Sequence, residues 1–236
     1  MQLSWAKMPS KWISSGKLKD LNANKNVAVN IAVIKIYILI CIRLAPSDNP
    51  RNSCVITYDE ISSVANLSRT VISGALKWLI GNNIIEASGK RVRIYSIPNY
   101  NNPGWCKFPI KDVVDKGGNV NFFKMISNRH PVELHALKLA LYLLAIRGND
   151  DEHSEVSLSK IISKTGVNYK DIFPALTLLK VLGLVSDFQR ETLPQRGIRV
   201  SLMEYKTDEV LNVYFPYGSY LPKSTRRSIS MPALTV

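Results

Sequence analysis

Four side chains between residues 69 and 77 carry groups that suit contact with a polyanion. Arg69, Thr70, Ser73 and Lys77 fall on one side of a helix if residues 68–80 are helical. An arginine can hydrogen-bond a guanine edge through two N–H groups, and a hydroxyl can donate to or accept from a base edge. The same residues are also compatible with an ordinary solvated helix face. The elements around them are needed to distinguish this from a DNA contact.

The residues around this segment predict the elements that would position it. Ser68 is a good N-cap for a helix over residues 69–80. One face of that helix is apolar at the spacing of a buried stripe, through Ile72, Ala75, Leu76 and Leu79. Thr57 and Glu60 form a capping box for a short preceding helix. Residues 84–95 then predict two strands joined by a tight turn.

The predicted hairpin adds a second group of cations. Lys90, Arg91 and Arg93 lie at or beside its tip, where contact with the DNA backbone or minor groove is expected. The start of the helix at Ser68 suits a phosphate. We interpret Gly74 as permitting close approach of the helix to a DNA backbone.

An apolar flank of the same helix predicts a protein contact. Val71 and Trp78 are seven residues apart, which places them on one outward side. We expect them to pack on another domain or on a partner chain, with core burial as the alternative for Trp78.

The chain repeats itself at a spacing of 100 residues. Trp5, Lys7 and Pro9 superpose on Trp105, Lys107 and Pro109, and the buried stripe at 72–79 superposes on the one at 172–179. Self-similarity at a fixed offset predicts two like units. We expect each tryptophan to begin a short segment that docks on its own unit, with a boundary in the Asn- and Pro-rich residues 98–104.

The second copy has the same predicted order of elements. Residues 135–147 match the apolar helix at 26–44, Ser157 and Asn168 cap two further helices, and strands are predicted at 184–189 and 198–203. The candidate DNA contacts of this copy are Tyr169, Lys170, Arg190, Arg196 and Arg199.

Two residues make the second copy the poorer reader of DNA. Pro174 removes a backbone donor, so its helix is expected to begin late or to bend. Phe173 predicts a protein contact. Beyond this copy, Arg226 and Arg227 form a basic stretch that is either a DNA-following arm or a disordered terminus.

Residues 68–85 resemble the recognition helix and wing of winged helix-turn-helix DNA-binding proteins of bacteria and phages. The tandem arrangement is similar to plasmid, phage and mobile-element replication initiators. The resemblance implies a mainly α fold with small β-hairpins (α+β), built from two tandem winged-helix domains. We predict the first domain, the main reader, at 1–100, the second at 101–215, and a basic tail at 216–236.

Composition supports a nucleic-acid partner. The 236 residues carry 31 Lys+Arg against 18 Asp+Glu, a formal net charge of +13 that attracts polyanions. The longest stretch without a polar residue, 36–42, is far shorter than the roughly 20 residues of a membrane span, so a buried helix is expected. Three cysteines without a CxxC pair favour a reducing compartment, and we predict a cytoplasmic, nucleoid-associated protein.

Catalytic patterns are missing from the sequence. It has no glycine-rich phosphate loop, and its three histidines have no metal-ligand spacing with the cysteines. We therefore predict no enzyme activity, no cofactor and no metal.

The leading hypothesis is a sequence-specific binder of double-stranded DNA, a transcriptional regulator. The alternatives are a replication initiator and a winged-helix adaptor that binds protein. A homodimer or a second protein partner through one domain stays open.

Overall fold

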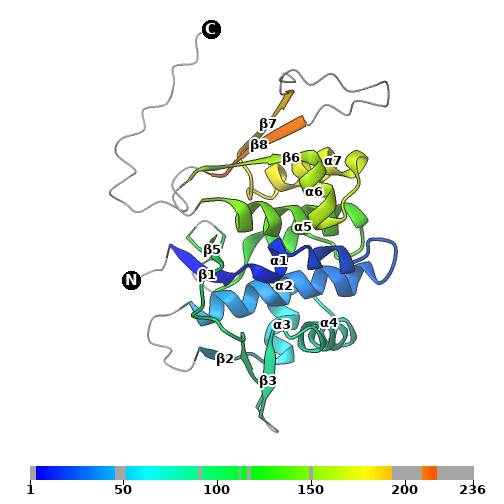
Figure 1. Ribbon diagram of the computed structural model, residues 1–236. Coiled ribbons are helices and arrows are strands. Elements are labelled where there is room, and N and C mark those ends of the chain that lie inside the picture. Colours follow the sequence, from blue (N-terminus) through cyan, green and yellow to red (C-terminus); the bar gives the residue numbers. More distant parts are fainter. Residues whose placement is uncertain are drawn as a thin grey trace.

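The computed structural model describes residues 4–45, 52–89, 92–111, 113–115, 118–148, 151–192 and 209–216. Within them the chain is mixed α+β, with seven α-helices and three small antiparallel sheets (Figure 1). The expected α+β class is confirmed. We call residues 1–100 the first half and residues 101–216 the second half.

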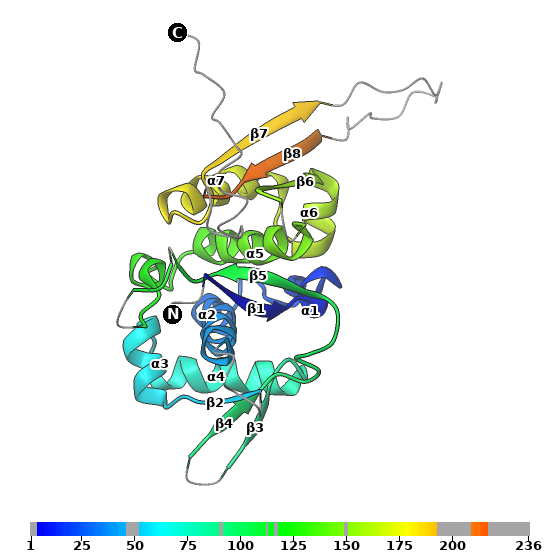
Figure 2. The ribbon, with the colours of Figure 1, turned by 90° about the vertical axis from the view of Figure 1, so that its left-hand side faces the viewer.

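Most elements fall into two sets that share one order: helix, strand, helix, helix, strand, strand. The first set is α2 (Val27–Leu44), β2 (Ser53–Val55), α3 (Tyr58–Ala65), α4 (Arg69–Gly81), β3 (Glu86–Ser88) and β4 (Ile94–Ser96). The second set is α5 (Pro131–Ile146), β6 (His153–Ser157), α6 (Leu158–Thr165), α7 (Tyr169–Val181), β7 (Asp187–Thr192) and β8 (Glu209–Tyr214). The strand orders also match, β2-β4-β3 and β6-β8-β7. Figure 2 shows the two sheets at opposite ends of the molecule.

Side-chain caps fix where the short helices begin. The hydroxyls of Thr57, Ser68 and Ser157 accept hydrogen bonds from the backbone N–H three residues on, at 3.1, 3.4 and 3.3 Å. These three predicted caps are confirmed. The Glu60 carboxylate, which was expected to complete the capping box, pairs with the Arg43 guanidinium instead.

Several predicted boundaries need correction. The first helix of the second half begins at Pro131 rather than at residue 135, and Asn168 makes no side-chain cap bond. Pro174 does not delay α7, which begins at Tyr169. The strand predicted at 198–203 is wrong as the partner of β7, because β7 pairs with β8 at 209–214. The edge strands β2 and β6 were not predicted.

A two-stranded ribbon joins the two halves. Strand β1 (Trp5–Pro9) pairs antiparallel with β5 (Trp105–Pro109), and Lys7 lies opposite Lys107 at the centre. The expectation that each segment docks on its own half is incomplete. β1 does contact α2, and β5 contacts α5, but the two strands also pair with each other. The repeated motif therefore forms the junction.

The outer face of the ribbon is a reciprocal aromatic and cationic cluster. The indole rings of Trp5 and Trp105 stack with centroids 5.6 Å apart and planes 6° apart. The Lys7 ammonium lies 5.4 Å from the Trp105 ring, and the Lys107 ammonium lies 5.7 Å from the Trp5 ring. Such cation–π contacts stabilise partly exposed pairs by about 0.5–1 kcal/mol each.

The segments that follow the ribbon cross over to the opposite half. After β1, α1 (Lys11–Ser14) contacts α5, and the 3-10 helix η1 (Lys17–Asp20) contacts α6. After β5, the 3-10 helix η2 (Asn121–Met125) contacts α3. Each half is therefore covered partly by chain from the other.

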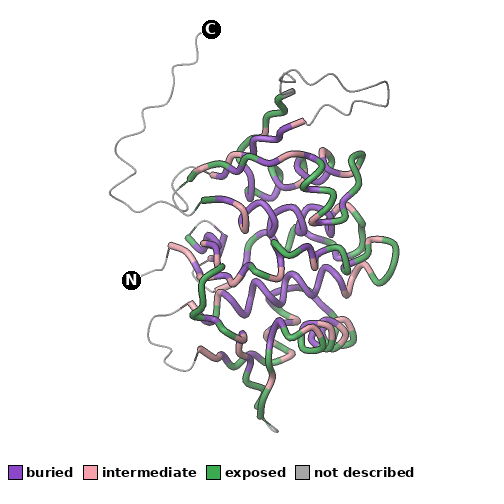
Figure 3. The backbone as a smooth tube through the Cα atoms, viewed as in Figure 1, coloured by how far each residue is buried: buried purple, intermediate pink, exposed green. Residues whose placement is uncertain are grey.

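The two long helices form the centre of one continuous core. Residues 30–41 of α2 and 133–144 of α5 are all buried (Figure 3). By length and composition α2 could cross a membrane. It is nevertheless packed against α4, α5 and β1, so its apolar surface is covered by protein. This burial is consistent with a soluble protein.

Each central helix buries one lysine against chain from the other half. In the first half, the Lys35 ammonium donates to the carbonyls of Ala65 and Phe123, both at 3.0 Å. In the second, the Lys138 ammonium donates to the Leu21 carbonyl at 3.0 Å. The two lysines are 0% and 2% exposed, so these carbonyls replace water.

Burial gives both lysines unusual titration. It lowers the pKa of Lys35 from 10.5 to about 7, against a smaller opposing effect of Glu133. It lowers the pKa of Lys138 to about 8, against a smaller effect of Asp20. The unfolded chain keeps these protons up to the ordinary value, so unfolding takes up protons above pH 7. A rise in pH through this range therefore favours the folded state.

We expect the free energy of unfolding to increase from about pH 6.5 to about pH 8, below the ordinary cysteine pKa. Lys35→Met should reduce that slope, by at most about 1.4 kcal/mol per pH unit. Urea unfolding at several pH values measures the slope, with Lys25→Met as the control at an exposed lysine. An unchanged slope in Lys35→Met would contradict this account.

Candidate nucleic-acid interface

Helix α4 presents a polar face because its other face is fixed in the core. The stripe of Ile72, Ala75, Leu76 and Leu79 is buried, and α4 packs against α2. Arg69, Thr70, Ser73 and Lys77 are consequently exposed, as the sequence predicts. Ser68 is exposed as well, and its hydroxyl is engaged as the cap.

The cations of this face differ in their partners. Arg69 pairs with Asp59 of α3 at 2.5 Å, but both side chains are mostly exposed, at 68% and 78%. An ion pair this exposed contributes little stability and can be exchanged for a phosphate. Lys77 and Arg93 have no acidic partner among the described residues. They leave positive charge available beside the helix.

A hollow between α4 and the β3–β4 hairpin brings three predicted contact residues together. Ser73 and Lys77 line it from the helix, and Arg93 lines it from the hairpin. Tyr58 and Tyr95 also line this space, whose volume is about 430 Å³. Leu76, Ile80, Gly81 and Ala87 form the apolar part of its lining, so the hollow is open and mainly apolar, with two cations and three hydroxyl groups along it. It can accept an anionic ligand that offers both hydrogen-bond donors and acceptors.

The matching face of the second half is filled by its own side chains. Phe173 stands at the position of Ser73, and its ring lies 6.3 Å from Phe188 and 6.1 Å from Tyr169. The Arg190 guanidinium covers the Phe173 ring at 5.9 Å and pairs with the Glu209 carboxylate. Phe173, Phe188 and Arg190 therefore pack together beside α7, whereas Ser73 and Lys77 line an open hollow beside α4.

Acidic groups also balance the charge of this second face. Glu209 accepts from the Tyr169 hydroxyl at 3.2 Å in addition to pairing with Arg190. Lys180 pairs with Asp187 at 2.9 Å. Arg190 lies within β7 rather than at the predicted tip. Lys170 is exposed at the start of α7.

The three residues predicted as interface residues all have contacts inside the chain. Trp78 lies edge-on to Trp12 of α1 at 6.4 Å, and Val71 packs half-buried on the core. Phe173 packs within its own half, as described above. A partner chain at these residues stays a prediction.

Six predicted contact residues lie outside the described residues. They are Lys90, Arg91, Arg196, Arg199, Arg226 and Arg227.

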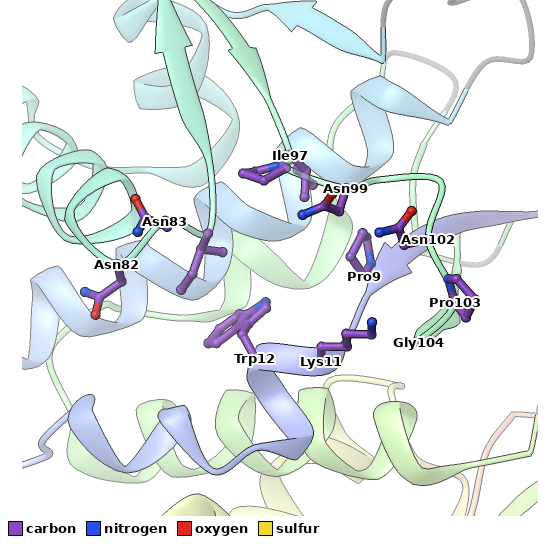
Figure 4. A pocket seen from close by; sticks show the side chains of 12 residues that line it. Pro9, Lys11, Trp12, Asn82, Asn83, Ile97, Asn99, Asn102, Pro103 and Gly104 are labelled. Carbon is purple, nitrogen blue, oxygen red and sulfur yellow. The ribbon is translucent and has the colours of Figure 1, made fainter.

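A second hollow, which the sequence did not indicate, lies where the chain passes between the halves. It is lined by the Pro9–Trp12 corner, the end of α4 and residues 97–104, and its volume is about 220 Å³ (Figure 4). Its polar lining consists of the side-chain amides of Asn82, Asn83, Asn99 and Asn102 and the ammonium of Lys11. These groups can hydrogen-bond a ligand. The four amides provide no nucleophile or general base for catalysis.

Comparisons with known proteins do not identify a function for this chain. No protein-family model matches the sequence, and no curated protein matches it.

Gly74 faces α2, contrary to its predicted role at DNA. A Cβ at this position would lie 3.3 Å and 3.4 Å from the two methyl carbons of Val29 in α2. The glycine therefore lets α4 pack closely against α2.

We expect Gly74→Leu to lower the free energy of unfolding by about 1–3 kcal/mol, because the added side chain overpacks the contact with Val29. Thr70→Leu, on the exposed face, should change it by less than about 0.5 kcal/mol. Urea unfolding of both variants makes the comparison. Equal stability of the two would show that Gly74 has no packing role.

Proposed function

We propose that this protein binds double-stranded DNA sequence-specifically, with α4 as the main reading helix and β3–β4 as the wing. The exposed side chains of Ser73, Lys77 and Arg93, brought together along one open hollow, are the observation that carries the proposal. A helix in the major groove needs outward donors, and a wing needs cations for the phosphates. Both are present on one surface here.

The order of elements supports a winged-helix assignment for each half. In each, three helices precede or flank a three-stranded sheet whose last two strands form a hairpin. The helix before the hairpin has its N-terminal residues exposed in both halves. We propose two winged-helix domains in tandem, the second a weaker reader because Phe173 and Arg190 fill its face.

Transcriptional regulation is the process that we propose for this binding, in the cytoplasm at the nucleoid. A replication initiator would use the same surface, and the position of the bound sites separates the two. A site in the gene's own promoter supports a regulator, whereas tandem repeats at an origin support an initiator.

We expect binding to weaken about a thousandfold between about 50 and 200 mM salt if six to eight cations contact phosphates. Lys77→Ala and Arg93→Ala should each lower the salt slope by about one. Arg69→Ala should cost about 1–3 kcal/mol and relax sequence preference if Arg69 reads a base. Titrations of specific and random duplexes at two salt concentrations measure all three effects.

Lys170→Ala is the matched control, because it removes the same charge at the start of α7. It should weaken binding less than Arg69→Ala. A larger loss in the control would transfer the reading role to the second half. Binding that responds neither to salt nor to any of these variants would refute the proposal.

A further inference from the structure

We propose that the DNA-binding surface of the first half is composite, completed by Lys124 and Arg129 from the second half. These residues would bind phosphates of the duplex that α4 reads. The inference rests on the proposed function. It gives Lys124 and Arg129, which belong to the second half, a role in the DNA binding of the first half.

The segment that carries them is fixed beside the α3–α4 turn. η2 contacts α3, and the Lys35 ammonium ties the Ala65 carbonyl at the end of α3 to the Phe123 carbonyl of η2. A few residues later, the buried side chain of Asn128 donates to the Asn66 carbonyl at 2.9 Å. Two independent contacts thus hold the segment in place.

The α3–α4 turn is where a phosphate is expected. Asn66 closes α3 in a left-handed conformation, and Ser68 caps the start of α4 two residues later. In the helix-turn-helix geometry, the start of the recognition helix approaches the DNA and its N–H groups favour an anion. Arg129 follows Asn128 directly in the sequence, so the contact of Asn128 with Asn66 holds the Arg129 backbone near the edge of the proposed contact surface.

Arg129 is anchored through its backbone, which leaves its side chain available. The Glu133 carboxylate accepts from the backbone N–H groups of Ser127, Arg129 and His130 at 2.6, 3.0 and 3.1 Å. Burial alone would raise the pKa of Glu133, but these bonds lower it, so the carboxylate stays ionised. The Arg129 side chain is exposed and has no acidic partner in the described parts of the chain.

Lys124 adds a second exposed cation in η2, beside α3.

The second half shows the reciprocal arrangement. A Cβ on Gly166, in the turn before α7, would lie 3.2 Å from Cγ of Lys19, which belongs to the first half. In both halves, therefore, the turn before the candidate reading helix is contacted by a segment of the other half. Only the first faces an open reading helix, which is why we assign the DNA contact there.

The test compares Arg129→Ala with Lys25→Ala in the full chain. Both residues are exposed, and each stands two positions before the central helix of its half. Arg129→Ala should weaken binding to specific and random duplexes alike, by about three- to tenfold, and lower the salt slope by about one. Lys124→Ala should act in the same direction, and Arg129→Lys should retain most of the affinity.

The thermal unfolding midpoint separates this effect from misfolding, because the exposed Arg129 side chain makes no described contact that Arg129→Ala would remove. Suppose Arg129→Ala and Lys124→Ala match the wild type while Lys77→Ala and Arg93→Ala weaken binding. The composite surface is then wrong and the proposed function stands. A greater loss in Lys25→Ala than in Arg129→Ala also overturns the inference. No salt-dependent binding by the wild type would overturn both.

Discussion

A buried ammonium group needs acceptors, and in this protein the acceptors come from both halves of the chain. Lys35 reaches one carbonyl in its own half and one in η2, while Lys138 reaches a carbonyl at Leu21. Removing an acceptor leaves a buried donor unsatisfied, which typically costs about 1–3 kcal/mol. Separating the two halves would break the bonds of Lys35 to Phe123 and of Lys138 to Leu21. The central helices, the ribbon and the crossing segments therefore depend on one another.

This shared framework explains how two like halves can differ in function. The central helices and the crossing segments place α4 and α7 in similar settings, so the difference lies in the side chains that each presents. Ser73 and Lys77 leave a hollow beside the first hairpin. Phe173 and Thr177 stand at the matching positions, and Phe173 packs with Phe188 and Arg190. Open basic surface favours a polyanion, whereas the filled, charge-balanced surface of the second half does not.

Local features of the structure could be predicted from the sequence. Thr57, Ser68 and Ser157 act within three residues of themselves, so their caps follow from residue type and position. The buried stripe of α4 follows from helical spacing. The exposure of Arg69, Thr70, Ser73 and Lys77 then follows from that stripe. Part of the candidate interface could therefore be predicted from the sequence.

Non-local features could not be predicted in this way. The repeated tryptophan motif indicates two copies, but spacing does not reveal that the copies pair with each other. A lone lysine within each apolar helix was a usable signal, since Lys35 and Lys138 had to find buried acceptors. The identity of those acceptors depends on the fold. Gly74 was misread because a glycine on a helix serves close packing as readily as ligand approach.

Hydrogen–deuterium exchange of the full chain, with and without a duplex selected from a random pool, locates the DNA-binding surface. We expect the duplex to slow amide exchange at the start of α4, in β3–β4 and in the segment around Arg129. Exchange in α7 and β7 should change little. Protection confined to α7 and β7–β8, with none at α4, would contradict the account.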